Sequence, residues 1–249
     1  MSILDRTLVT DGCTTAYIDK TYPSNLAYKP QFISNNYKEG RKVISSIEDE
    51  LLTCREFFIS VAFITMGGIT PLLQTLKELE KRGIPGKILT TDYQNFSEPR
   101  ALRKLAELSN ISLKMYRTDE AREGFHTKGY IFKDEGLYRI ILGSSNLTLN
   151  ALTKNREWNT KVVSTDQGEY AEDLMIEFQE LWNSKYAAAF DDFIEAYALN
   201  YKIIQKQRKI ARETQIPSLE QYKLQPNSMQ LGFIANLEKI RGARESRAL

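Results

Sequence analysis

The sequence predicts an α/β fold in which a mixed β-sheet is covered by helices. Short apolar segments rich in β-branched and aromatic residues alternate with segments whose apolar residues recur every three to four positions. The first pattern is typical of strands and the second of helices, and their alternation favours parallel pairing of some strands. Two further strand-like segments are separated only by the polar residues KDEG, which indicates an antiparallel hairpin.

Each predicted strand is short, apolar and bounded by turn residues or by a helix-like segment. The strands are expected over residues 57–64, 87–91, 111–116, 126–132, 138–144 and 157–164. In the first of them, FFISVAFI, both faces are apolar, which predicts a strand buried on both sides of the sheet. The polar, turn-rich residues 1–37 are expected to add a short strand or an ordered arm.

Helical spacing of apolar residues, together with proline and glycine at typical end positions, predicts the helices. They are expected over residues 39–52, 71–82, 99–108, 149–154, 168–182 and 187–212. Pro71 suits the first turn of a helix and Gly83 suits a C-cap, whereas residues 66–68 (MGG) are expected to form a turn. The helix over residues 168–182 is expected to bury a stripe of Tyr170, Leu174, Phe178 and Leu181.

Composition narrows the class of protein. The chain of 249 residues has two cysteines, Cys13 and Cys54, which are too few for a disulfide framework or a thiolate metal cluster. No apolar run approaches the ~20 residues of a membrane-spanning helix, and the first residues lack the basic head and apolar run of a secretion signal. We therefore expect a cytoplasmic protein with no membrane partner. The net charge of +2 neither demands nor excludes a nucleic-acid partner.

The residues that suggest a chemical function lie in and just after the predicted hairpin. His126 and Lys128 are two apart on a predicted strand, so alternation would point both side chains to the same face. Ser144 and Asn146 lie at the end of the neighbouring strand, and an antiparallel hairpin can bring that end beside His126. Glu157 is expected to open the next strand near the same edge.

These residue types suit phosphoryl transfer. The imidazole of His126, the only histidine in the chain, can attack phosphorus and form a covalent intermediate. Lys128 supplies positive charge, and Ser144 and Asn146 add hydrogen-bond donors for the phosphate oxygens. Glu157 can hold the imidazole tautomer. None of these steps needs a metal, and the sequence has no His/Cys/Asp cluster typical of a metal site, so we expect no cofactor and no metal in this domain.

At these residues the sequence resembles the phospholipase D superfamily, the HKD enzymes, whose pattern is His-x-Lys, an acidic residue and then Gly-Ser-x-Asn. Here HTK occupies residues 126–128 and GSSN occupies residues 143–146. Glu157 follows Asn146 by eleven residues, which is the spacing of the nuclease branch. The family often has Asp five residues after the Lys, but this sequence has Lys133 there and Asp134 one residue later.

The resemblance implies a phospholipase-D-like mixed sheet with helices on both faces, followed here by a helical C-terminal extension. It implies that His126 is the nucleophile or the acid for the leaving group, and that Lys128, Ser144 and Asn146 contact phosphate. It gives Glu157 a supporting role. The family's active site uses two facing motifs, whereas this chain has one, so catalysis would require a homodimer that shares one active site.

The C-terminal sequence KLQPNSMQLGFIANLEKIRGARESRAL is similar to the segment before the ATP-binding loop of superfamily 2 (DEAD/DEAH-type) helicases. In those proteins a Pro and a Gln open a helix ahead of a strand. Pro226, Gln230 and a helix over residues 231–240 fit this arrangement, and residues 247–249 would begin the strand. The alternative interpretation is a simple C-terminal docking helix.

This second resemblance sets the expected domain boundaries. Residues 1–212 would form the phospholipase-D-like domain with its helical extension, and residues 213–249 a linker and the start of a truncated helicase domain. The longer protein would resemble restriction or DNA-repair enzymes with a nuclease-like N-terminal domain. ATP and Mg are expected only for the missing helicase part.

Three functions remain open from the sequence. The first is a metal-independent nuclease that cleaves nucleic acid, with DNA expected, through a phosphohistidine intermediate and is attached to a helicase. The second is a non-catalytic module that binds the nucleic-acid backbone for a helicase. The third, ranked last because the chain has no obvious interfacial amphipathic helix, is a phospholipase or phosphatidyl transferase.

Overall fold

The structure is a computed structural model that describes residues 29–213. The chain separates into two compact units, Met1–Ile204 and Gln205–Leu249, and the sheet and the candidate residues all belong to the first. The predicted linker and helicase-like segment over residues 214–249 lie outside the described residues, as do Cys13 and most of the predicted N-terminal arm.

Within the described residues, eight strands form one mixed sheet in the order β1-β7-β6-β5-β2-β3-β4-β8. The strands are β1 (Gln31–Ile33), β2 (Glu56–Val61), β3 (Gly86–Thr91), β4 (Ile111–Tyr116), β5 (Lys128–Asp134), β6 (Leu137–Gly143), β7 (Asn159–Thr165) and β8 (Ala187–Ala189). β2, β3 and β4 are parallel, and β5 and β6 form the antiparallel hairpin that the sequence predicts. Gly136 in the hairpin turn has φ +65°, a conformation that favours glycine.

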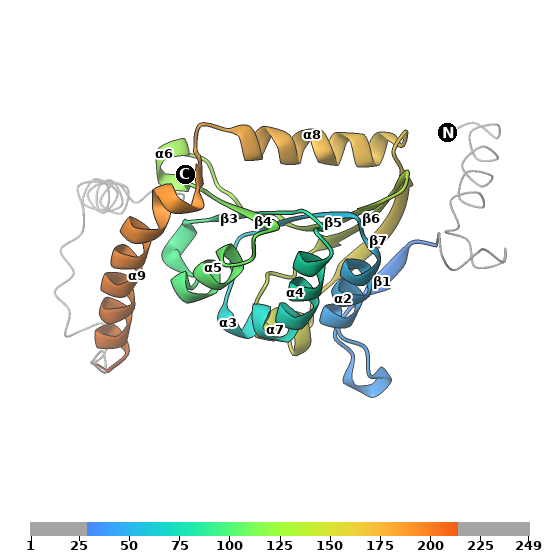
Figure 1. The fold of residues 1–249 in the computed structure, drawn as a ribbon. Coiled ribbons are helices and arrows are strands. Elements are labelled where there is room, and N and C mark those ends of the chain that lie inside the picture. Colours follow the sequence, from blue (N-terminus) through green and yellow to red (C-terminus); the bar gives the residue numbers. More distant parts are fainter. Residues whose placement is uncertain (1–28, 214–249) are drawn as a thin grey trace, which may run out of the picture. The chain divides into compact units, whose positions relative to one another are not determined.

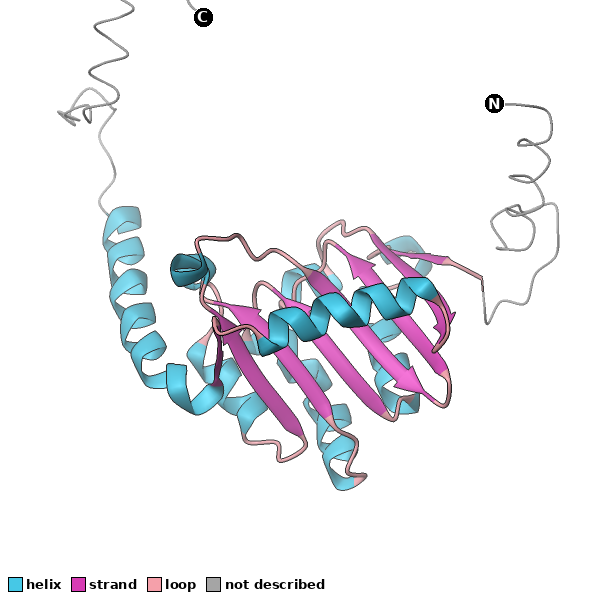
Figure 2. Cartoon of the chain, turned by 90° about the horizontal axis from the view of Figure 1, so that it is seen from above, coloured by secondary structure: helices cyan, strands magenta, loops and turns pink. Residues whose placement is uncertain are grey.

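Helices cover both faces of the sheet, as predicted. The α-helices are α2 (Val43–Thr53), α3 (Met66–Ile69), α4 (Leu73–Lys81), α5 (Pro99–Ala106), α6 (Thr118–Ala121), α7 (Leu149–Thr153), α8 (Glu169–Asn183) and α9 (Phe190–Glu213). Short 3-10 turns span Tyr37–Glu39, Thr70–Leu72 and Tyr93–Asn95. α8 lies across one face, while α2, α4, α5 and α7 lie on the other (Figures 1 and 2).

The core has two layers because alternate side chains of the central strands point to opposite faces. In β2, Phe57, Ile59 and Val61 pack on the side of α2, α4 and α5, whereas Phe58 packs on the side of α8. The prediction that this strand is buried on both faces is confirmed. Gly83, with φ +67°, follows α4 at the position where the sequence predicts a C-cap glycine.

Two local predictions are wrong. Residues 66–68 open helix α3 instead of forming a turn, because Oγ1 of Thr65 accepts the N–H of Gly68 at 3.2 Å and caps that helix. The predicted helix from residue 187 begins as β8, whose alanines favour helix but pair with the free edge of β4.

The predicted apolar stripe of α8 faces the sheet except at its first residue. Leu174, Phe178 and Leu181 pack against the core on this side of the sheet, together with Ala171 and Trp182, whereas Tyr170 is exposed. Phe178 and Trp182 stack on each other, and Phe178 also meets Phe58 of β2 edge to face. This aromatic contact fixes which side of α8 faces the sheet.

Candidate active site

The candidate residues lie at the edge of the sheet where β2 and β6 end and where β5 and β7 begin. Val61 at the end of β2 is paired with Lys128, and Gly143 at the end of β6 is paired with Asn159. The antiparallel ladders therefore bring to this edge two chain segments that are distant from each other in sequence. The predicted residues at or next to it are His126, Lys128, Ser144, Asn146 and Glu157.

His126 lies before the strand that was predicted to contain it, because β5 begins only at Lys128. Phe63 would pair with His126 in a longer ladder, but its N–H donates to Oδ1 of Asn146 at 3.1 Å. The carbonyl of Phe63 accepts the N–H of Leu147, also at 3.1 Å. The prediction that strand alternation aligns His126 with Lys128 is therefore wrong. Instead, Nζ of Lys128 donates to the carbonyl oxygen of His126 at 2.7 Å.

The His126 side chain is accessible. The residue is exposed, and its ring stands edge-on to the Phe63 ring with 6.3 Å between the centroids. Within residues 29–213 the ring forms no hydrogen bond, so neither of its nitrogens is engaged by another group of these residues. The imidazole is supported by an aromatic neighbour but is not enclosed in the apolar core.

Ser144 and Glu157 are joined directly. The Ser144 hydroxyl donates to Oε2 of Glu157 and accepts the N–H of Trp158 at 3.1 Å. Glu157 is buried, and its other oxygen faces the Asn155 amide at 3.5 Å. Glu157 precedes β7 by two residues instead of opening it, because β7 begins at Asn159. No hydrogen bond links Glu157 to the imidazole among the described residues, so its predicted role in holding the tautomer stays a prediction.

Asn146 uses one end of its amide to hold the loop and leaves the other end available. Its Oδ1 accepts the N–H of Phe63, while its Nδ2 has no hydrogen-bond partner in the part of the chain that the structure describes. The amide nitrogen can therefore donate to a phosphate oxygen, which is the contact that the sequence predicts.

The loop that carries these groups is fixed by Asn159, a residue that the sequence analysis did not select. Asn159 is 2% exposed, and its Oδ1 accepts the N–H of Ser145 at 3.4 Å. Its Nδ2 donates to Oγ of Ser145 at 2.9 Å and to the carbonyl of Ile33 at 3.4 Å. The buried Tyr130 hydroxyl donates to the Ser145 carbonyl at 2.9 Å. The only feature of the sequence that could have indicated Asn159 was its position as a polar residue at the start of an apolar strand.

Burial and charge act together on two groups at the site. Burial lowers the pKa of the Lys128 ammonium below its usual value, and the negative charge of Glu157 partly opposes this shift. Burial raises the pKa of the Tyr130 phenol, and Glu157 raises it further. Lys128 is therefore a lysine in a partly dry environment with a carboxylate nearby, which suits contact with a phosphate group.

Asp134 does not belong to this site. It lies at the far end of β5, where it forms ion pairs with Arg55 at 3.3 Å and with Arg139 at 3.7 Å. A hydrogen bond from the backbone N–H of Glu135 is the main cause that lowers the pKa of the Asp134 carboxyl. Asp134, the acidic residue that lies nearest in sequence to the position in the family pattern, is thus away from the edge that carries His126.

A cavity of about 340 Å³ lies beside the candidate residues, between the sheet and α8. Its lining includes His126, Thr127 and Lys128 at one end and apolar side chains of α8 such as Leu174 and Leu181. The Thr127 hydroxyl is 2.6 Å from that of Ser60, which ties the His126 segment to β2.

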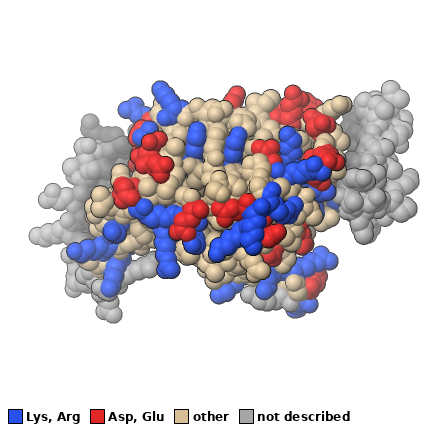
Figure 3. Space-filling view, viewed as in Figure 1, with Lys and Arg blue, Asp and Glu red and all other residues tan. Residues whose placement is uncertain are grey.

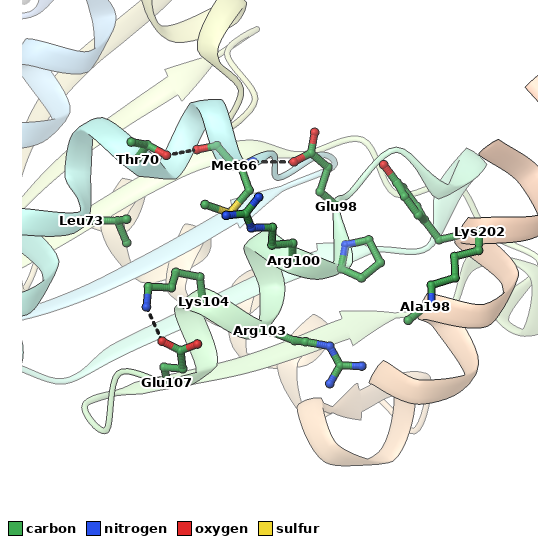
Figure 4. A pocket seen from close by; sticks show the side chains of 12 residues that line it. Met66, Thr70, Leu73, Glu98, Arg100, Arg103, Lys104, Glu107, Ala198 and Lys202 are labelled. Atoms are coloured by element: carbon green, nitrogen blue, oxygen red, sulfur yellow. Dashed lines mark hydrogen bonds and ion pairs between the residues drawn. The ribbon is translucent and has the colours of Figure 1, made fainter. Parts of the chain in front are cut away.

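A larger hollow of about 920 Å³ is formed by residues of α3, α5 and α9 (Figure 4). It is lined by several charged side chains, but Arg103 is paired with Glu195 at 2.9 Å and Lys104 is paired with Glu107. Glu98 accepts the N–H of Met66 at 2.8 Å. None of the five candidate residues lines this hollow, so we place the site at the sheet edge.

Charges of both signs are interspersed over the face shown in Figure 3, in keeping with the net charge of +2. Among residues 29–213, no three His, Cys, Asp or Glu side chains gather in a way that could hold a metal ion. In the same residues, no helix combines the length and apolar character that crossing a membrane requires.

Comparison with protein families gives one match that covers half of the chain. The family described as "Cardiolipin synthase, PLD-like domain" matches residues 50–182, a range that contains all five candidate residues. No curated protein matches the chain.

Comparison with solved structures gives matches at low sequence identity. Nuc from Salmonella typhimurium, a phospholipase D family member, is 20% identical over 65% of this chain and 99% of its own, with a TM-score of 0.51. NucT from Helicobacter pylori is 20% identical over the same shares, with a TM-score of 0.52. Phosphatidylserine synthase from Haemophilus influenzae is 15% identical over 74% of this chain and 46% of its own, with a TM-score of 0.49. The first two show that the fold is shared.

Proposed function

Because the chain belongs to the family of phospholipase-D-like domains, we propose that it is a phosphodiesterase that cleaves nucleic acid, with DNA as the expected substrate. The observation that carries this proposal is the gathering of an exposed imidazole, an ammonium group, a hydroxyl and an amide at one sheet edge. These groups can bind a phosphodiester and supply a nucleophile for it.

In the proposed reaction, a ring nitrogen of His126 attacks phosphorus. A P–N bond forms while the P–O bond to the departing strand breaks, and the departing oxygen takes a proton from His126 of a second copy. Water then attacks phosphorus and gives its proton to that second histidine. The P–N bond breaks, and its electron pair returns to the first ring. Each step uses only side-chain atoms and water, so we propose that cleavage is independent of metal ions.

The roles of the other residues follow from their positions. Lys128 and the free end of the Asn146 amide can hold the non-bridging phosphate oxygens. Ser144 either donates to Glu157, as here, or turns its proton to the phosphate when substrate is bound. Glu157 keeps this hydroxyl in place and offsets the cost of burying the Lys128 ammonium.

A homodimer is part of the proposal, because one chain supplies one histidine. If two copies share one phosphate, a dimer with a single His126 lacks either the nucleophile or the acid. Mixing wild-type and His126→Ala subunits should then lower the rate as the square of the wild-type fraction. A linear decrease would show that each subunit works alone.

The main test is cleavage of labelled DNA by the whole chain in the presence of EDTA. We expect products with the wild type, and a rate at least about a thousandfold lower with His126→Ala. The phosphohistidine is tested by quenching with alkali and looking for labelled phosphate on the wild-type protein but not on the variant. Tight binding without products would favour a non-catalytic binding module, and turnover of phosphatidylcholine without cleavage of DNA would favour a lipid enzyme.

We also propose that residues 213–249 lead into a superfamily 2 helicase domain, which would supply ATP-driven movement along the nucleic acid. This part of the proposal rests on the sequence resemblance alone. A longer chain that hydrolyses ATP only when nucleic acid is present would support it, and one without this activity would contradict it.

A further inference from the structure

Exposed aromatic side chains lie on both sides of the polar cluster along the same sheet edge. On the β1–β7 side, Phe32 is 62% exposed and Trp158 is 74% exposed, and their ring centroids are 6.1 Å apart. Trp158 directly follows Glu157, and its backbone N–H contacts Ser144. A large aromatic ring that stays exposed forgoes the stabilisation that burial would give it. Its position beside the candidate site therefore suggests a role in binding.

The second group lies on the β2–β3 side of His126. Phe63 meets the His126 ring edge-on, and its ring centroid is 5.0 Å from that of Phe96, which is 40% exposed. The order β7-β6-β5-β2 places the two aromatic groups three strand spacings apart, roughly 14 Å, with the polar cluster between them.

A groove of about 540 Å³ continues from Glu157 past the first aromatic group. Phe32 and Trp158 line it together with three exposed cations, Lys38, Lys154 and Arg156. Within the described residues these cations form no ion pair, and the only carboxylate in the lining is the buried Glu157. Unpaired cations beside exposed rings are suited to a polyanion that carries flat apolar groups.

We propose, on the basis of the function proposed above, that this edge binds a single-stranded nucleic acid. The scissile phosphate lies at His126 and Lys128, and unpaired bases stack on Trp158 and Phe32 on one side and on Phe96 on the other. Lys38, Lys154 and Arg156 hold the backbone on the Trp158 side. In a duplex the bases stack on one another and cannot offer their faces to these rings, so the rings select an unpaired strand.

Trp158 provides its own probe. The chain contains two tryptophans, and the other, Trp182, is 7% exposed. Titrating the whole chain carrying His126→Ala, which does not cleave, with an oligothymidylate strand should quench the fluorescence of Trp158, because a stacked base is in ring contact. The duplex of the same length should quench it much less. Equal quenching by duplex and single strand would overturn the proposal.

The matched variants are Trp158→Ala, Trp158→Phe and Tyr170→Ala. Tyr170 is also an exposed aromatic residue, at 47%, but it lies on α8, away from the edge. Each variant is made in the His126→Ala protein so that the strand stays intact. In fluorescence anisotropy with a labelled single strand, Trp158→Ala should bind about tenfold more weakly. Trp158→Phe should restore most of the affinity, and Tyr170→Ala should bind like the wild type. Wild-type affinity in Trp158→Ala would overturn the proposal.

A small substrate separates this inference from the proposed function. Bis(p-nitrophenyl) phosphate is a phosphodiester without a strand, so its hydrolysis by the wild type but not by His126→Ala reports the enzymatic function separately from strand binding. If the wild type cleaves neither this substrate nor DNA, yet Trp158→Ala still loses strand binding, the enzymatic function fails and the strand site stands. If the wild type cleaves both substrates and Trp158→Ala binds the strand like the wild type, the function stands and the strand site fails.

Two other occupants of the aromatic edge are outcomes of the same experiment. If Trp158→Ala sediments as a smaller species than the wild type, a second copy of the chain covers the rings. If the wild type binds phosphatidylcholine vesicles in a Trp158-dependent manner but does not bind the strand, the rings contact lipid. Either result would overturn the proposal.

Discussion

The ammonium group of Lys128 donates a hydrogen bond of 2.7 Å to the backbone carbonyl of His126. The two residues of the HTK segment are thus joined although only Lys128 lies in strand β5. An ammonium group has three donors, so this bond leaves others for a phosphate. The contact also fixes where the chain turns away from the sheet, and therefore where the imidazole is presented.

Replacing Lys128 with Met should separate function from stability. We expect cleavage to fall about 10²–10³-fold, because a donor to the phosphate is lost. We expect the urea midpoint to stay the same or rise, because burial already disfavours the ammonium. Lys133→Met is the control, since Lys133 lies at the opposite end of the same strand. A clear loss of stability in Lys128→Met would show that the lysine is structural.

The lowered pKa of Lys128 predicts how binding depends on pH. The charged form exists below the pKa, so the contribution of the Lys128 charge to binding is present at neutral pH. This contribution is lost as the pH rises, and it is lost at a lower pH than for an exposed lysine. A His126→Ala protein, which does not cleave, should therefore bind a short oligonucleotide more weakly as the pH is raised above neutral. Adding Lys128→Arg should remove that decrease because arginine stays protonated. Identical pH profiles for the two proteins would contradict the prediction.

Replacing Asn159 with Ala should destabilise the protein by about 2–3 kcal/mol, because it leaves buried groups of Ser145 and Ile33 without partners. Urea unfolding measures the change. Asn150→Ala is the matched control, since Asn150 is exposed on α7 and alanine favours helix. We expect the cleavage rate of the folded Asn159→Ala protein to fall as well, because the GSSN loop loses its support.

Replacing Gly68 with Ala tests the contact between α3 and the loop after β6. A Cβ there would lie 2.0 Å from the carbonyl oxygen of Leu147, so the backbone has to move. We expect a loss of about 1–3 kcal/mol in the free energy of unfolding and a lower cleavage rate. Gly124→Ala should change neither, because nothing lies within 4 Å of the place that its added methyl group would occupy. Wild-type stability in Gly68→Ala would rule out this tight packing.

Much of the fold could be predicted because its signals are local. The strand ISLKMY was predicted at the limits that β4 has, and Gly83 was predicted to end the helix that it follows. The hairpin between β5 and β6 was predicted from a polar turn with a glycine. Each signal, such as the spacing of apolar side chains or a special φ angle, depends on residues that are neighbours in sequence.

The strand limits at the site could not be predicted. His126 and Glu157 were placed in strands, but both lie before them. No local pattern indicates that Asn146 takes the N–H of Phe63 and so stops the β2–β5 ladder. β8 was missed for a similar reason, since its pairing depends on β4 leaving an edge open.

The sequence by itself determined the alternation of strands and helices and the set of phosphate-binding residue types. The repeat of apolar residues, the turn residues and the motif spacing all act between positions that are close in the sequence. The tertiary structure alone decided which of these groups meet. It joined Ser144 to Glu157, tied the loop through Asn159 and set Phe32 against Trp158. These contacts join residues 13 to 126 positions apart, and such pairings follow from how the whole sheet packs.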